Sequence, residues 1–136
     1  MIRPLRVLLD RRRHRHGDWG DLFEPYQGDE VVSLDCETSG LDTRRDAIIS
    51  VGAVRVSGCT IGTSDALDIT LSAPESLDPD SVRVHRLRRQ DLRGGIPMDE
   101  AMDQVLKYVG NRPILGYNVA FDIAMIDQHI QPLFGF

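Results

Sequence analysis

The sequence predicts an α/β domain in which helices flank a mixed β-sheet. In its first half, three runs of β-branched and apolar residues follow one another, as in an antiparallel meander. The second half contains helical periodicity around one further short apolar run, an order typical of a strand that joins the sheet in parallel with the first. A length of 136 residues fits a single compact domain.

The first 29 residues are expected to form a segment apart from this sheet. Residues 5–15 have the pattern of a short basic amphipathic helix, which Gly17 ends. Large apolar side chains then alternate with Gly, Asp and Pro, which predicts an irregular arm that packs onto a neighbouring surface. The large side chains of this arm are Trp19, Leu22, Phe23 and Tyr26.

Three strands are expected at the start of the main unit, residues 30–136. Residues 30–37 have an apolar centre, which is typical of a buried strand. Residues 47–56 are rich in β-branched residues and predict a second strand in hairpin relation to the first. Gly52 within this run indicates a bulge or a close backbone approach. A weaker third strand is expected over residues 66–71.

The rest of the chain is predicted to be mainly helical. Residues 80–87 indicate a short helix, and residues 97–109 a stronger one with an apolar stripe at 3.6-residue spacing. Residues 114–117 predict a short strand, and residues 120–131 a final helix that Pro132 ends.

Two carboxylates stand at the end of the first predicted strand. Asp35 and Glu37 are two residues apart, so both side chains project from the same face of the sheet. Like charges held this close repel each other, and a divalent cation between them removes the conflict. Carboxylate oxygens suit Mg²⁺ or Mn²⁺ better than zinc. The alternative interpretation is a solvated strand end before a turn.

A third acidic residue, Asp122, lies in the first turn of the final predicted helix. If the strand before this helix is the parallel neighbour of the first strand, Asp122 meets Asp35 and Glu37 at the same edge of the sheet. An acidic residue in a first helical turn is also favoured simply by the helix dipole, which is the alternative interpretation.

Charge and hydropathy narrow the possible functions. The formal net charge of −5 argues against a protein that holds nucleic acid through a broad basic surface. This charge is compatible with an enzyme that acts on nucleic acid through an acidic metal site and local arginine clusters. No apolar run approaches the ~20 residues that span a membrane, and no signal-peptide pattern is present, so no membrane association and a cytoplasmic location are expected.

Three segments together resemble motifs of the DEDD superfamily of 3′-to-5′ exonucleases, histidine subtype, and most of all the epsilon-type proofreading exonucleases of bacterial replicative DNA polymerases. They are residues 34–41 (LDCETSGL), 49–54 (ISVGAV) and 116–122 (GYNVAFD). His85 lies in a further segment, VHRL, which is similar to the family's VHGI. The resemblance covers residues 30–132.

This resemblance implies a ribonuclease H-like fold and two-metal hydrolysis of terminal phosphodiesters with Mg²⁺ or Mn²⁺. Asp35 would bridge both ions, Glu37 would bind the ion that activates water, and Asp122 would bind the other. The implied substrate is a single-stranded 3′ end of DNA or RNA. The residues that match substrate-binding positions of the family are Thr38, Leu41, His85, Asn118 and Phe121.

The family's third motif, a His followed five residues later by an Asp on a last helix, does not occur in the sequence. His129 is no replacement, because seven residues of helix separate it from Asp122 by about 10.5 Å. We therefore expect an N-terminal portion of the exonuclease fold that lacks its last strand and helix and is impaired as an enzyme. The alternative is a non-catalytic module that binds nucleic acid or a subunit.

The apolar residues at the end of the sequence suggest a partner. If no last helix covers them, Leu133, Phe134 and Phe136 are expected to form an exposed apolar patch. A polymerase subunit or a second chain would then cover this patch.

Overall fold

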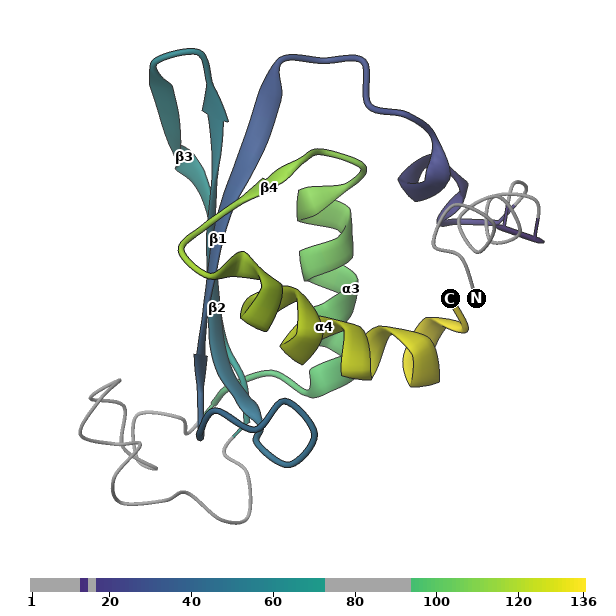
Figure 1. Cartoon of the computed structure of the whole chain (residues 1–136), viewed down its shortest axis with the longest axis vertical. Coiled ribbons are helices and arrows are strands. Elements are labelled where there is room, and N and C mark those ends of the chain that lie inside the picture. Colours follow the sequence, from purple (N-terminus) through teal and green to yellow (C-terminus); the bar gives the residue numbers. More distant parts are fainter. Residues whose placement is uncertain (1–12, 15–16, 73–93) are drawn as a thin grey trace.

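The computed structural model describes residues 13, 14, 17–72 and 94–136, which form a four-stranded sheet with two α-helices on one of its faces (Figure 1). The mixed α/β fold class is confirmed. The elements are η1 (Gly20–Phe23), β1 (Glu30–Thr38), β2 (Ile48–Ser57), β3 (Thr60–Thr70), α3 (Met98–Val109), β4 (Ile114–Leu115) and α4 (Val119–Phe134).

The strand order is β3-β2-β1-β4, so β1 lies between β2 and β4. β1 pairs antiparallel with β2 and parallel with β4, as the sequence predicts. β3 begins at Thr60, six residues before the predicted start, because a tight turn at Gly58 returns the chain directly into the sheet. The early part of β3 is exposed and polar, and it therefore lacks the apolar pattern by which a buried strand is predicted.

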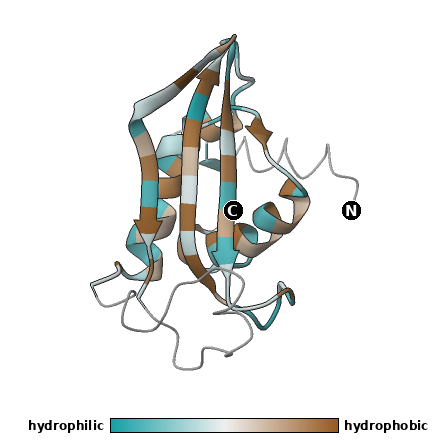
Figure 2. Ribbon diagram, turned by 90° about the vertical axis from the view of Figure 1, so that its left-hand side faces the viewer, coloured by the Kyte–Doolittle hydropathy of each residue, from teal (hydrophilic) through white to brown (hydrophobic). Residues whose placement is uncertain are grey.

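The core lies between the sheet and the two helices. Val32, Leu34 and Cys36 alternate along β1 with less buried residues and point into this core. Met102 of α3 and Met125 of α4 are fully buried against them. Figure 2 shows the other face of the sheet in front of the helices, and no described element covers it. We call this surface the open face.

The final helix continues past Pro132, and the prediction that this proline ends it is wrong. A proline removes one backbone donor and strains the preceding turn, but it does not prevent another turn when packing supports it. The helix ends instead at Gly135, which adopts the left-handed conformation and donates its backbone N–H to the Gln131 carbonyl at 3.0 Å.

The N-terminal arm packs onto the end of α4, as the arm's composition predicts. The Trp19 ring lies edge-on to Phe134, with ring centroids 5.3 Å apart, and the Phe23 ring lies edge-on to Phe136 at 5.2 Å. Phe134 and Phe136 are therefore half-buried, and their expected exposure is wrong. Leu133 is exposed by 42%. The arm supplies the aromatic partners that the prediction assigned to another chain.

Polar contacts fix the rest of the arm beside the loop between α3 and β4. The Asn111 side-chain amide donates to the Glu24 carbonyl at 2.9 Å. Arg112 Nε donates to the Glu30 carboxylate at 2.8 Å, and its guanidinium lies over the Tyr26 ring. These contacts hold the arm against the start of β1.

Some predictions concern residues outside the described ranges. They are the helix at residues 80–87, with His85, and most of the basic helix at residues 5–15. In the described ranges, no helix is both long and apolar enough to cross a lipid bilayer.

Two glycines of the β2–β3 region, Gly52 and Gly58, test whether the open face has room for a side chain at Gly52. A Cβ added at Gly52 or at Gly58 would meet no atom within 4 Å, but only Gly58 has a positive φ, +56°. We expect Gly52→Ala to stabilise the fold by roughly 0.4–1 kcal/mol, because alanine restricts the unfolded chain. Gly58→Ala should destabilise it by about 1 kcal/mol, because an L-residue is strained at that φ. Urea denaturation midpoints compare the two variants, and a loss of stability in Gly52→Ala contradicts the described open space.

Candidate active site

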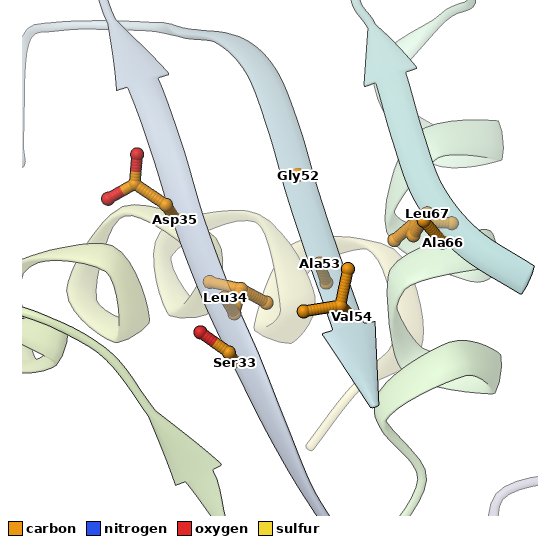
Figure 3. A pocket seen from close by; sticks show the side chains of 8 residues that line it. All are labelled: Ser33, Leu34, Asp35, Gly52, Ala53, Val54, Ala66 and Leu67. Carbon is orange, nitrogen blue, oxygen red and sulfur yellow. The ribbon is translucent and has the colours of Figure 1, made fainter. Parts of the chain in front are cut away.

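Two of the three predicted carboxylates lie on β1 and project from its open face. Asp35 is exposed and Glu37 half-buried, whereas Cys36 between them is buried on the core side. Asp35 pairs with Gly52 of β2, which has no side chain, so the neighbouring strand leaves the space beside the Asp35 carboxylate free (Figure 3). Strand alternation alone produces this arrangement.

The third carboxylate reaches β1 between the other two. Asp122 Oδ1 accepts a hydrogen bond from the backbone N–H of Cys36 at 2.9 Å, and the Asp122 side chain is only 3% exposed. On this edge of β1, the Val32 N–H donates to the Pro113 carbonyl next to β4. β4 ends at Leu115, so it cannot supply an acceptor as far along as Cys36. Asp122 takes the place of the missing strand neighbour.

The connection from β4 to α4 explains how Asp122 arrives there. Gly116 lies so close to β1 that an added Cβ would be 2.8 Å from the Leu34 carbonyl oxygen. Asn118 then adopts the left-handed conformation, with φ 51° and ψ 35°, and turns the chain into the helix. The Phe121 N–H donates to the Asn118 carbonyl at 2.8 Å. The first turn of α4 is thereby held beside β1.

Burial and mutual repulsion alter the acidity of this group. Burial, followed by the negative charge of Asp122, raises the pKa of Asp35. Burial also raises the pKa of the Cys36 thiol, and the neighbouring carboxylates add to this effect, with Asp122 the strongest of them. Cys36 is therefore a neutral thiol at neutral pH and not a thiolate ligand. The available donors are carboxylate oxygens, which suit Mg²⁺ or Mn²⁺ better than zinc.

The three carboxylates surround one peptide group without forming a complete ligand set. In the part of the chain that the structure describes, no three His, Cys, Asp or Glu side chains are arranged so that they could hold a metal ion. One oxygen of Asp122 is occupied by the Cys36 N–H, while Asp35 projects from the open face. The assignment of Asp35, Glu37 and Asp122 as metal ligands therefore stays a prediction.

The predicted substrate-binding residues have different surroundings. Thr38 Oγ1 donates to the Gly40 carbonyl at 2.7 Å, and Leu41 is 86% exposed. Asn118 is exposed at the start of α4. Phe121 is half-buried and packs against the core, so the described structure gives its ring a structural contact. The substrate roles of these residues stay predictions, and His85 lies outside the described residues.

The loop after β1 depends on Asp46, which the sequence did not single out. Asp46 accepts hydrogen bonds from the Ser39 hydroxyl at 3.2 Å and from the Asp42 N–H at 2.7 Å. A Cβ at Gly40 would collide with the same carboxylate. The Ser39 hydroxyl in turn accepts the Ala47 N–H at 2.9 Å. This network fixes the loop that follows Asp35 and Glu37. The only sequence signal for it is the presence of turn-forming residues in this loop.

A hollow of about 310 Å³ lies beside Asp35 (Figure 3). Its lining residues are Ser33, Leu34, Asp35, Gly52, Ala53, Val54, Ala66 and Leu67. Most of these side chains are small, and the volume is at the lower end of the range for small-molecule sites. The hollow therefore leaves room for part of a ligand next to the Asp35 carboxylate.

Two substitutions distinguish the contribution of the Asp122 hydrogen bond to folding stability from the contribution of its charge. We expect Asp122→Ala to lose roughly 1–3 kcal/mol of folding stability, because it leaves the Cys36 N–H without its acceptor. Asp122→Asn retains a side-chain carbonyl for this hydrogen bond and removes the repulsion with Asp35, so it should be about as stable as the parent. Urea denaturation at pH 7 measures both variants. Equal losses in the two would show that the hydrogen bond does not support the fold.

The comparison with known proteins agrees with the geometry. The sequence profile of a family described as Exonuclease matches residues 32–134. The chain is 29% identical over 106 residues to the PolC-type DNA polymerase III of Clostridium perfringens and 29% over 121 residues to the oligoribonuclease of Streptomyces griseus. It is 25% identical over 107 residues to the DNA polymerase III subunit epsilon of Pasteurella multocida.

These relatives are longer proteins. The three alignments cover 77%, 79% and 75% of this chain, but only 7%, 60% and 42% of the respective relatives. The chain therefore spans 7% of the PolC-type polymerase, 42% of the epsilon subunit and 60% of the oligoribonuclease.

The fold is shared with solved structures of exonuclease I. A product-bound exonuclease I superposes with a TM-score of 0.70 at 19% identity, covering 79% of this chain and 26% of that one. Escherichia coli exonuclease I in complex with a dT13 oligonucleotide gives 0.69 at 18% identity, covering 79% and 24%. These matches confirm the ribonuclease H-like fold. Because the family profile spans most of the sequence, this chain belongs to the exonuclease family.

Proposed function

We propose that this chain is a metal-dependent nuclease domain that acts on single-stranded 3′ ends of DNA or RNA. The observation that carries the proposal is the 2.9 Å hydrogen bond from Cys36 N–H to Asp122, because it brings a third carboxylate between Asp35 and Glu37. Membership of the exonuclease family supports this class of reaction. The names of the relatives include both DNA polymerase subunits and oligoribonucleases, so we leave the sugar of the substrate open.

In this proposal Asp35, Glu37 and Asp122 hold two divalent cations, Mg²⁺ or Mn²⁺. When bound, such ions lower the pKa of a bound water and stabilise the charge that develops on the phosphoryl group. The protein fixes the ligands: strand alternation directs Asp35 and Glu37 to one face, and the Cys36 N–H orients Asp122. Desolvation, and after it the negative charge of Asp122, raises the pKa of Asp35, and a bound cation would offset both effects.

The proposed reaction also needs a general base, and His129 is a poor candidate for it. Burial lowers the pKa of His129, and its buried Nε2 has no hydrogen-bond partner among the described residues. It also lies two turns along α4 from Asp122. We therefore assign His129 to the packing of α4, and we expect the 136-residue chain to be slow. General base catalysis is typically worth 10²- to 10⁴-fold.

The second candidate function is a non-catalytic module that binds nucleic acid or a subunit. Its support is that one Asp122 oxygen is already occupied by the backbone and that the described carboxylates form no complete metal site. This candidate retains the fold and the hollow beside Asp35 but predicts no hydrolysis.

We expect the chain to release mononucleotides from the 3′ end of a 5′-labelled single-stranded oligonucleotide in Mn²⁺, and a chelator to abolish this release. Asp35→Asn and Glu37→Gln should reduce the rate to background, because each removes a charged ligand. Asp68→Asn is the matched control: Asp68 is an exposed acid that pairs with Gly52 from the other side, so the change in charge is equal. Gel separation of DNA and RNA products measures the rates and identifies the sugar.

Equal background in the parent and in both ligand variants would contradict catalysis by this chain. Thermal unfolding in Mn²⁺ then separates the two candidates, since an ion that binds only the folded state raises its stability. No increase, together with no cleavage, favours the binding module, whereas an increase that is lost in Asp35→Asn shows a cation site that does not suffice for hydrolysis.

A further inference from the structure

Among the described residues, two large apolar side chains are more exposed than any others, and both lie in loops that follow β1 or its parallel neighbour β4. Tyr117 is 97% exposed and Leu41 is 86% exposed. Tyr117 lies in the loop after β4, and Leu41 in the loop after β1, its parallel neighbour. Ligands of α/β sheets bind outside the carboxyl ends of such strands. The sequence prediction included Leu41 but not Tyr117.

The backbone holds Tyr117 in a fixed position. Gly116, directly before it, lies against the Leu34 carbonyl. Asn118, directly after it, is the one non-glycine residue with positive φ in the described ranges, a conformation that Asn adopts more readily than other side chains and that turns the backbone into α4. The chain on either side of Tyr117 is therefore constrained, while its side chain is 97% exposed and packs against none of the described residues. Folding gives no reason for an aromatic side chain at this position.

The two anchors of this loop flank Asp35. The Leu34 carbonyl precedes Asp35 on β1, and the Cys36 N–H, which binds Asp122, follows it. The short segment that carries Tyr117 thus spans the same stretch of β1 from which the Asp35 carboxylate projects. The backbone at Tyr117 therefore lies beside the stretch of β1 that carries Asp35.

The chemistry of the site favours stacking as the means of recognition. Three carboxylates repel the phosphates of a nucleic acid, and the chain as a whole carries a net charge of −5. Stacking of a base on an aromatic ring does not depend on charge, and it tolerates any base sequence. A tyrosine on a constrained stretch of backbone, with its ring left exposed, has the surface that such stacking requires.

We propose that Tyr117 stacks on a nucleobase of the single-stranded substrate and so holds the neighbouring phosphodiester at the carboxylates. This inference rests on the proposed function for its substrate class. It assigns to Tyr117 a contribution to substrate binding that is separate from metal binding and from hydrolysis.

A binding assay tests the inference without cleavage. In the Asp35→Asn background, fluorescence anisotropy measures the Kd of a 5′-fluorescein-labelled single-stranded oligodeoxynucleotide. Tyr117→Ala should raise this Kd about tenfold, whereas Tyr117→Phe, which keeps the ring, should stay within about twofold. Ile61→Ala is the matched control, since Ile61 is also an exposed apolar side chain, at 59%, but lies on β3. It should leave the Kd unchanged.

Abasic probes identify the base as the contact. If the last three nucleotides of the oligonucleotide lack bases, the Tyr117-containing chain should bind this probe at least as weakly as Tyr117→Ala binds the normal one, and the substitution should have no further effect on the abasic probe. An unchanged Kd in Tyr117→Ala, or an equal loss on normal and abasic probes, overturns the inference. Mn²⁺-dependent cleavage by the parent, measured in parallel, shows whether the proposed function fails independently of Tyr117.

Discussion

The hydrogen bond from the Cys36 N–H to Asp122 Oδ1 joins the fold and the candidate site. It exists because β4 ends early and leaves the edge of β1 without a strand partner at this point. An unpaired buried N–H is costly, so the acceptor has a structural reason to be there. The acceptor is also a carboxylate, and it therefore brings a third negative charge beside Asp35. The same group that satisfies the backbone produces the electrostatic conflict of the site.

The position of Asp122 depends on both ends of α4. At the N-terminal end, the close approach of Gly116 to β1 and the left-handed turn at Asn118 direct the first turn towards the sheet. At the C-terminal end, Trp19 and Phe23 of the arm pack against Phe134 and Phe136. The helix is thus held by the sheet at one end and by the start of the chain at the other. The arm contributes to the site indirectly, by fixing the helix that carries Asp122.

The features that short-range patterns determine could be predicted from the sequence. Alternation with a period of two placed Asp35 and Glu37 on one face, and the order of apolar runs gave the parallel pairing of β1 with β4. Features that depend on distant contacts could not be predicted. The hydrogen bond of Asp122 depends on the residue at which β4 ends. The continuation of α4 past Pro132 depends on the packing of Phe134 against Trp19, which is more than a hundred residues away in the sequence. The exposed, polar first half of β3 lacks the pattern by which strands are recognised.

In the proposed function, Asp35, Glu37 and Asp122 act as one cation-binding group around the Cys36 peptide. Paramagnetic broadening by Mn²⁺ in amide NMR spectra of ¹⁵N-labelled protein measures this most directly, because it reports distance from the ion and does not require catalysis. Substoichiometric Mn²⁺ is expected to broaden the Asp35, Cys36, Glu37 and Asp122 amides first, and Asp35→Asn to abolish the effect. Broadening spread over the exposed acids of the surface, and unchanged by Asp35→Asn, would contradict the proposed cation site.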